Sequence, residues 1–458
     1  MKQILITGDR SGSGKTSITL ALTALLAKKY RVQTFKVGMD YIDPSYLAAA
    51  SGRLCRNLDS FALTTGQIHE IFSYGCRDAD IAIVEGVRGL YEGAEALSDV
   101  GSTAAIAKEL DLPVILVVSA QSITRSAAAL VKGFQAFDPK IRIAGVILNN
   151  VKGGSHKAKA VTAIEHYCGV PVIGAIPRMD EMQLTMRHLG LVPYREGAGK
   201  GDFDTRIQTI TDMIGQYVDL DRLLSLMKEG DVPLHPSPSF ERTTKPDVTI
   251  GIAYDEAFNF YYADLYDVLR SLGAEPVMFS PVHDHLPEAD GYIIGGGYPE
   301  LYARELESNQ AMRDAIRTAS KNGIPIYAEC GGLMYLTDRI VLQAGWQGAT
   351  EERHYAMCGV FSGETRMPAR RVVSYVTGTS DADSPLGAAQ FQGHEFHHSD
   401  VVLSPGTRYA YRLSRGIGIQ DNLDGAVIDN TLGSYTHLHP VGSKGMLEHF
   451  VRICRKKA

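Results

Sequence analysis

The sequence has few cysteines, and no two of them lie close together. Its 458 residues include six, at positions 55, 76, 168, 330, 358 and 454. Because none of them forms a CxxC pair, neither a disulfide framework nor a zinc site is indicated. Sparse, unpaired cysteines are typical of proteins from a reducing compartment. We therefore expect a cytoplasmic protein.

Long apolar runs and long basic runs are also missing. No apolar stretch approaches the roughly 18 residues that a transmembrane helix needs, so we expect no membrane partner. The formal net charge is -6 and no long basic stretch occurs, which argues against nucleic-acid binding. The opening "MKQILITGD" begins the first strand at once, and we expect no signal peptide. The sequence leaves a homodimer open.

Two α/β patterns and a proline-rich segment between them make up the chain. Over residues 1–230, apolar runs such as "QILITG", "IAIVEG" and "PVILVVSA" alternate with helical patterns. Runs without polar alternation predict strands buried on both faces, and hence a parallel sheet. Residues 231–247 are rich in proline and polar residues and predict a linker. A second α/β domain is expected over residues 248–458, richer in strands from about residue 340.

The segment "ITGDRSGSGKTS" predicts a phosphate-binding loop between the first strand and the first helix. Backbone N–H groups of a glycine-rich loop at a helix N-terminus bind anions, the lysine adds charge, and the hydroxyl binds Mg²⁺. The strict pattern needs glycine at position 9, where this chain has Asp9, and Gly8 gives a longer loop. The residues expected to bind nucleotide are Gly12, Gly14, Lys15, Thr16, Ser17 and Tyr41.

Acidic residues follow two other predicted strands. Glu85 lies next to the end of "IAIVEG", and Asp40 and Asp43 lie in "KVGMDYIDPSY". Alone, either aspartate is as readily a helix cap as a ligand. Beside a phosphate loop, Thr16, Asp43 and Glu85 are the candidate Mg²⁺ ligands. "EGVRGLYEG" adds Glu92, also expected at the carboxyl ends of the strands, where open parallel sheets bind ligands.

The segment "YAECGGLMYL" places Cys330 at the end of a predicted strand, with two glycines behind it. A cysteine nucleophile needs a histidine nearby and donors for the oxyanion that forms during attack. "GYIIGGGYPEL" can supply backbone donors at Gly296 and Gly297, and "GSYTHLHP" supplies His437 and His439. A buried structural thiol is the alternative for Cys330 alone. The three segments together favour a nucleophile.

These motifs resemble a known family. Residues 248–458 look like a class I glutamine amidotransferase domain of the type fused to cobyric and cobyrinic acid synthetases. Residues 1–230 are similar to the P-loop synthetase domain of those enzymes, which is of the dethiobiotin synthetase type. "GDRSGSGKT", "KVGMDYIDPSY", "VEGVRGLYEG", "GGGYPEL", "AECGGLMYL" and "GHEFHHS" carry the resemblance to a,c-diamide synthases of tetrapyrrole biosynthesis, almost end to end.

The resemblance implies a ligase that uses ATP, Mg²⁺ and glutamine to amidate two carboxylates of a tetrapyrrole through acyl phosphates. Cys330 would be the glutaminase nucleophile and His437 its catalytic histidine, with His439 as runner-up. The usual glutamate two residues after the histidine is replaced by His439, so a Cys–His pair is expected unless another group orients the base. In the synthetase domain, Asp40, Tyr41 and Glu92 would lie near the reacting carboxylate. The roles of His394 and Glu395 in "GHEFHHS" stay open.

Two macrocycles fit the resemblance. The cobyrinate enzymes usually have proline before the first aspartate of "KVGMDYIDPSY", where this chain has Met39, which favours Ni-sirohydrochlorin over cobyrinate. Because the substrate is a polyanion, arginines are expected to line its pocket, and the candidates are Arg10, Arg53, Arg56 and Arg88. A further candidate enzyme is cobyric acid synthase, but this chain lacks the "YxHG" ending of that family. A P-loop scaffold ATPase without amidotransferase activity is the alternative from another class.

Overall fold

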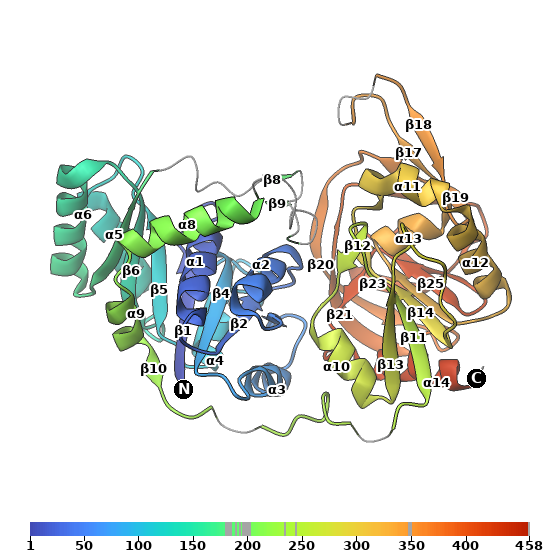
Figure 1. Ribbon diagram of the computed structural model, residues 1–458, viewed down its shortest axis with the longest axis horizontal. Coiled ribbons are helices and arrows are strands. Elements are labelled where there is room, and N and C mark those ends of the chain that lie inside the picture. The colour runs from blue at the N-terminus through green and yellow to red at the C-terminus, as the bar shows by residue number, and fades with distance from the viewer. Residues whose placement is uncertain are drawn as a thin grey trace. The chain divides into compact units, whose positions relative to one another are not determined.

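The computed structural model describes residues 1–178, 186–187, 190–191, 194, 203–232, 235–242, 245–346 and 350–456. Its internal contacts divide the chain into two units, Met1–Ser237 and Pro238–Ala458 (Figure 1). The division falls inside the segment predicted as a linker. Within the described ranges, no helix has both the length and the hydropathy that crossing a membrane requires.

The first unit is built on a parallel sheet, as predicted. The strands run in the order β3-β2-β4-β1-β5-β6-β7, and the short strand β10 pairs antiparallel with the start of β1. Their bounds are β1 Lys2–Gly8, β2 Val32–Val37, β3 Arg56–Leu58, β4 Ile81–Gly89, β5 Val114–Ser119, β6 Ile143–Val151, β7 Val172–Pro177 and β10 Lys228–Glu229. Burial of both faces explains why β1 and β5 are apolar without alternation.

Helices cover this sheet and return the chain between its strands. They are α1 Lys15–Ala27, α2 Ile42–Ser51, α3 Thr65–Gly75, α4 Thr103–Glu109, α5 Arg125–Phe137, α6 Gly153–Cys168, α8 Phe203–Tyr217 and α9 Leu220–Leu226. Helix α1 packs against α2 and α8, and α5 packs against α6 (Figure 1). A short hairpin, β8 Met186–Arg187 and β9 Gly190–Leu191, lies between α6 and α8 in the sequence. Because β1 and β2 both neighbour β4, the three predicted motifs that follow these strands meet at one edge of the sheet.

The second unit combines parallel and antiparallel strands in one sheet of order β13-β11-β14-β16-β25-β24-β23-β20-β21-β26. The bounds are β11 Val248–Ala253, β13 Ala274–Phe279, β14 Gly291–Ile294, β16 Ile326–Glu329, β20 Val372–Ser380, β21 Ala389–His397, β23 Arg408–Arg415, β24 Leu423–Ile428, β25 Thr431–Ser434 and β26 His437–Leu438. Pairing is parallel from β13 to β25 and antiparallel from there on. The predicted enrichment in strands towards the C-terminus is therefore confirmed.

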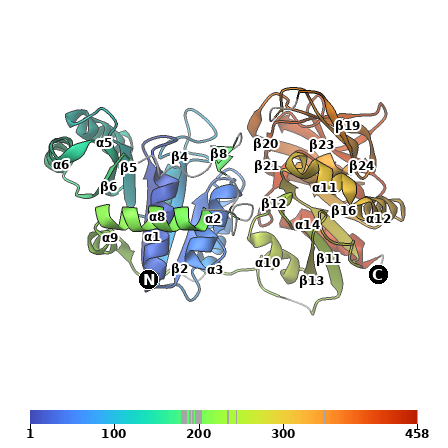
Figure 2. The ribbon, with the colours of Figure 1, turned by 45° about the horizontal axis from the view of Figure 1, so that its top comes forward.

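Two smaller sheets and several helices complete the described part of this unit. The sheets are β18-β17-β19-β22 (Arg353–Ala356, Thr337–Leu342, Phe361–Met367 and Asp400–Leu403) and β12-β15 (Phe258–Phe260 and Gly296–Gly297). The helices are α10 Asp264–Ser271, η2 Pro299–Tyr302, α11 Ala303–Ser308, α12 Gln310–Lys321, α13 Gly331–Leu336 and α14 Lys444–Arg455. Helix α10 packs against β13 and α14 (Figure 2).

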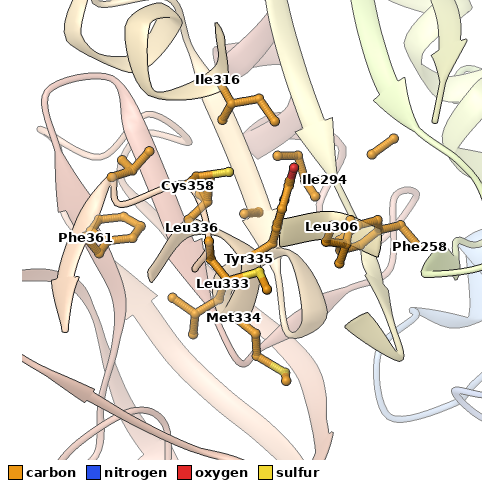
Figure 3. Close-up of a cluster of buried hydrophobic side chains, with 14 of the residues drawn as sticks. Phe258, Ile294, Leu306, Ile316, Leu333, Met334, Tyr335, Leu336, Cys358 and Phe361 are labelled. Atoms are coloured by element: carbon orange, nitrogen blue, oxygen red, sulfur yellow. The ribbon is translucent and has the colours of Figure 1, made fainter. Parts of the chain in front are cut away.

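Helix α13 is held by the hydrophobic core of the second unit. All six of its residues are buried, and Leu333 to Leu336 lie in one cluster with Phe258, Ile294 and Leu306 (Figure 3). A close-packed core resists displacement of any member. The packing of α13 therefore fixes the position of the residue immediately before it, Cys330.

Candidate active sites

The phosphate-binding loop joins β1 to α1, as predicted. Gly12 and Gly14 have φ of 79° and 93°, the left-handed region that glycine adopts without a steric penalty. A side chain at Gly14 would collide with the amide of Asn149, which donates a hydrogen bond to the Ser13 carbonyl at 2.9 Å. The loop is thus wrapped closely around the N-terminus of a 13-residue helix, the arrangement that presents backbone N–H groups to an anion.

Thr16, Asp43 and Glu85, the predicted Mg²⁺ ligands, lie together. The Thr16 hydroxyl is 2.8 Å from Glu85 Oε1 and 3.2 Å from Asp43 Oδ2. Lys36 of β2, which the sequence analysis did not single out, lies among them. Its Nζ donates to Asp43 Oδ2 at 2.6 Å and to Glu85 Oε1 at 2.9 Å, and it is 1% exposed. The available signal was a single lysine inside the second predicted strand.

The charges of this cluster perturb one another. Burial alone would lower the pKa of Lys36, but Asp43 and Glu85 outweigh it and raise that pKa above its usual value. Burial and the neighbouring Lys36 lower the pKa of Lys15. Burial and the charge of Asp43 raise the pKa of Asp40 to about 6. The site is therefore a buried set of carboxylates that two lysines neutralise in part.

The donor set suits a hard divalent cation that also binds phosphate. A hydroxyl and two carboxylates converge, and Glu85 Oε2 is buried without a hydrogen-bond partner. Mg²⁺ takes oxygen ligands, usually one or two carboxylates together with phosphates and water. Among the described residues, no group of three or more His, Cys, Asp or Glu side chains is arranged to hold a metal alone. An ion here would therefore depend on nucleotide phosphates for the rest of its shell.

Of the other predicted synthetase residues, most lie next to this cluster in the chain. Asp40 accepts hydrogen bonds from the backbone N–H groups of Ile42 and Asp43, so it caps α2, and it is 3.9 Å from Lys36 Nζ. Tyr41 is the N-cap residue of α2, and Ser17 is in the first turn of α1. Glu92 lies beside Gly89, at the end of β4, where a Cβ would collide with its carboxylate.

The arginine candidates do not gather at this edge of the sheet. Arg53 donates to the carbonyls of Gly75 and Arg77, and the Arg56 guanidinium lies 4.7 Å from the Tyr74 ring centre. Both line a cavity of about 370 Å³ at the C-terminal end of α3. That end leads towards the amino end of β4, whereas the phosphate loop follows the carboxyl end of β1. Arg53 and Arg56 therefore lie away from the phosphate loop. Arg10 lies in that loop, largely exposed and paired with Asp9, and Arg88 lies near the carboxyl end of β4. That arginines line the substrate pocket stays a prediction.

Cys330 occupies a strained turn between β16 and α13. Its φ of 47° and ψ of -98° lie outside the regions that ordinary residues adopt readily. The two residues that follow it must be glycine, because a side chain at either position would come too close to neighbouring backbone. A Cβ at Gly331 would lie 3.0 Å from the backbone N of Gly297, and one at Gly332 would collide with the carbonyl of Ile294. The glycines let the elbow pack directly on the "GGG" segment after β14.

His437 begins β26 and reaches Cys330 from the antiparallel part of the sheet. It is 1% exposed, and one ring nitrogen, Nδ1, lies 3.2 Å from Glu329 Oε2. Burial alone would lower the pKa of His437, but hydrogen bonds to Cys330 and Glu329 and their charges raise it to about 10. The geometry therefore favours an imidazolium next to the sulfur.

The expected Cys–His pair is incomplete as a description of this site. Glu329, the residue directly before the cysteine, contacts Nδ1 of His437, and the position two residues after His437 is His439. His439, the runner-up for the catalytic histidine, lies elsewhere. Its Nε2 is 3.7 Å from Asp264 Oδ2, and its ring centre is 4.7 Å from that of Tyr262.

The "GHEFHHS" segment, most of which lies in β21, packs beside His437. His394 is the direct cross-strand partner of His437, and their rings stack with centres 4.8 Å apart. Glu395 accepts hydrogen bonds from the backbone N–H groups of Ile417 and Gly418. His397 stacks on Tyr435 with centres 3.7 Å apart. These contacts give the segment a structural part in placing the 435–437 turn.

Comparisons with known proteins match both units. Residues 4–192 match the family model described as a CobQ/CobB/MinD/ParA nucleotide binding domain, and residues 249–444 match the CobB/CobQ-like glutamine amidotransferase domain. The described α/β units fit this pair of domains in this order.

Relatives similar to the whole chain come from methanogens. The "Cobyrinate a,c-diamide synthase" of Methanosarcina barkeri is 50% identical, covering 99% of this chain and 96% of its own length. Those of Methanosarcina acetivorans and Methanothermobacter thermautotrophicus are 50% and 42% identical, covering 99% and 98% of this chain and 95% and 99% of their own lengths. The chain therefore belongs to the cobyrinate a,c-diamide synthase family of glutamine-hydrolysing ligases.

Proposed function

We propose that this enzyme converts the a and c side-chain carboxylates of a tetrapyrrole to amides, using ATP and the amide nitrogen of glutamine. The observation that carries the proposal is the presence in one chain of two built sites. One has a phosphate loop above a buried carboxylate–lysine cluster, and the other has a cysteine at a strained elbow beside an imidazole.

In the glutaminase site, Cys330 attacks the side-chain carbonyl of glutamine. In the ion pair that the raised pKa of His437 favours, the imidazolium already holds the thiol proton and gives it to the departing ammonia, which leaves a thioester that water hydrolyses to glutamate and free thiol. Backbone N–H groups of the Gly296–Gly297 segment are the proposed donors to the oxyanion, since Gly297 packs directly against the elbow.

In the synthetase site, the γ-phosphoryl group of ATP passes to a carboxylate oxygen, which gives an acyl phosphate and ADP. Ammonia then displaces phosphate and forms the amide. Lys15 and the α1 N-terminus hold the phosphates, and Asp40, Tyr41 and Glu92 are the proposed neighbours of the reacting carboxylate. Thr16, Asp43 and Glu85 would hold Mg²⁺, which when bound supplies positive charge to the phosphate oxygens.

Lys36 adds a cation that the sequence motif did not reveal. Its ammonium group lies between Asp43 and Glu85, the two carboxylates proposed as metal ligands. A buried charge persists only with partners. We propose that Lys36 holds these carboxylates in place before the nucleotide binds, and that it would contact the phosphates when Mg²⁺ occupies the site.

For the macrocycle we propose Ni-sirohydrochlorin, with cobyrinate as the second candidate. Met39 stands where the cobyrinate enzymes usually have proline, and the relatives come from methanogens, whose nickel tetrapyrrole derives from Ni-sirohydrochlorin. The names of these same relatives support cobyrinate. Both reactions use the same two sites and the same positions on the macrocycle.

The test is a mass-resolved assay with ATP, Mg²⁺ and glutamine, run in parallel on both macrocycles. Two successive changes of OH to NH₂ on Ni-sirohydrochlorin alone would support the first candidate. The same result on cobyrinate alone would replace it with the second. Glutamine hydrolysis without amidation of either would refute a tetrapyrrole substrate and leave the Cys330 site standing.

A further inference from the structure

We propose that Glu329 is the positioning residue of the glutaminase site, and that it orients His437 in place of the glutamate missing after the histidine. The inference deepens the proposed function and rests on Cys330 being its nucleophile. Nothing in the spacing of the sequence motifs indicates it, because Glu329 and His437 are 108 residues apart.

The carboxylate of Glu329 is held on both of its oxygens. Oε2 is 3.2 Å from His437 Nδ1, and Oε1 accepts the backbone N–H of Leu438 at 3.0 Å. The Tyr327 hydroxyl, two residues earlier on β16, also donates to Oε1. The side chain of Glu329 is 12% exposed. A carboxylate with three donors and little contact with water has one preferred orientation, which the imidazole must share.

The unusual backbone of Cys330 makes this arrangement possible. In an extended strand, consecutive side chains point to opposite faces, so neighbours cannot reach one ring. The left-handed φ of 47° at Cys330 breaks that alternation at the end of β16. Glu329 and Cys330 can therefore both contact His437, one at each ring nitrogen. The strain at the elbow serves the orientation of the base as well as the placement of the sulfur.

The contact fixes the tautomer that the chemistry requires. With Nδ1–H donating to Glu329, Nε2 is the nitrogen that remains to take the proton of Cys330. When that proton moves to Nε2, the ring becomes an imidazolium, and the carboxylate beside Nδ1 stabilises its charge. Glu329 itself forms no bond to glutamine and transfers no proton. It acts through His437 alone.

The other groups around the ring do not supply this charge. His394 stacks on His437, and burial lowers the pKa of His394 well below its usual value. Burial likewise lowers the pKa of His397 to about 4, and His397 is also close enough to interact with His437. Both are neutral near pH 7. Among the described groups that face the ring, Glu329 and the sulfur of Cys330 are the ones that favour its protonated form.

The test compares Glu329→Gln with Tyr327→Phe and with a matched control, Glu364→Gln. Glu364 lies on β19, away from the elbow, and pairs with Arg339 and Arg366. Its substitution therefore makes the same chemical change at a different place. Three quantities are measured in the full chain: glutaminase kcat and KM, their dependence on pH, and the rate at which iodoacetamide alkylates Cys330, mapped by mass spectrometry. ATP-dependent amidation driven by ammonium reports on the other unit.

For Glu329→Gln we expect kcat to fall by roughly 10²- to 10⁴-fold with a much smaller change in KM, as when a triad carboxylate becomes an amide. The alkaline limit of the glutaminase profile should move to lower pH, because the ring loses the charge that keeps it protonated. Tyr327→Phe should produce the same shift to a smaller extent, since the carboxylate stays but loses one donor. Glu364→Gln and ammonium-driven amidation should match the wild type.

A Glu329→Gln enzyme with wild-type kcat and an unmoved pH profile would overturn the inference. If that variant does not fold, Tyr327→Phe decides, and an unshifted profile there counts against it. A wild-type enzyme that hydrolyses no glutamine would instead refute the proposed function itself, so the two failures are distinguishable.

Discussion

Replacing Gly296 by alanine should impair the glutaminase site by moving its base. A Cβ at this position would lie 2.7 Å from Cε1 of His437 and 3.3 Å from the Phe260 side chain. The backbone of Gly296 is not in the left-handed region, so alanine brings no conformational strain of its own. It also keeps the backbone N–H. Any loss of activity therefore reports displacement of the imidazole or of the strand that faces it.

The expected size of the effect follows from this distance. Ordinary contacts of a Cβ begin near 3.4 Å, so ring and strand must separate by about 0.7 Å. His437 has little freedom to move, because Glu329 binds its edge and His394 covers a face. Misplacement of a catalytic group by about 1 Å costs on the order of 10²-fold in rate, equivalent to ~2.7 kcal/mol. We expect a loss of that order in glutaminase kcat/KM.

The assay measures glutamate release by the wild type, by Gly296→Ala and by a control, Gly445→Ala. Gly445 lies in α14, and a Cβ there would meet nothing within 4 Å. Thermal unfolding and ammonium-driven amidation confirm that each variant is folded. Glutaminase activity of Gly296→Ala within twofold of the wild type would show that the imidazole is not confined as described, and would refute the reasoning.

Three further outcomes are expected. Cys330→Ala should abolish amidation with glutamine and leave amidation with ammonium; loss of both would contradict two separate sites. Lys36→Met should lower the free energy of unfolding by roughly 3–5 kcal/mol, because it leaves Asp43 and Glu85 buried without their cation; denaturant unfolding measures this, and an unchanged value would contradict the ion cluster. The pKa of His437 is raised from about 6.5 in the unfolded chain to about 10, so its charge stabilises the fold fully below pH 6.5 and ceases to do so as pH rises through 10. The stability difference between wild type and His437→Gln should therefore shrink over that range, and a growing difference would contradict the assignment.

Parallel-strand topology made the synthetase cluster predictable in part. Thr16 and Asp43 follow two strands and Glu85 lies in the carboxyl half of a third, and the carboxyl ends of parallel neighbours necessarily meet. Lys36 was missed because it is one of three polar residues in "VQTFKV" and does not stand out there. Its meaning depends on burial, which no local pattern reveals. Since a fully buried ammonium needs anionic partners, a lysine in a central strand is itself a reason to search for carboxylates.

In the glutaminase site, two residues were found from sequence motifs and a third was missed. Cys330 and His437 could be found from motifs, because nucleophile, glycines and histidine each leave a signal. Glu329 could not, since strand alternation places it on the face opposite to its neighbour. The prediction fails there because the elbow departs from regular geometry. Arg53 and Arg56 lie away from the phosphate loop for a topological reason, as the segment before β3 is at the amino edge of the sheet.

The charges of the synthetase cluster also bear on how ATP can enter it. Asp40, Asp43 and Glu85 bring three carboxylates, against the two cations of Lys15 and Lys36. A triphosphate adds several more negative charges within the same buried space, where the energy of unpaired charge is high. The charges of the two lysines alone cannot balance both the carboxylates and the phosphates. A divalent cation that enters with the phosphates removes the conflict, and the unpartnered Glu85 Oε2 provides an oxygen for it. The proposed Mg²⁺ would thus enter the cluster together with the nucleotide, and binding of the bare anion would be disfavoured.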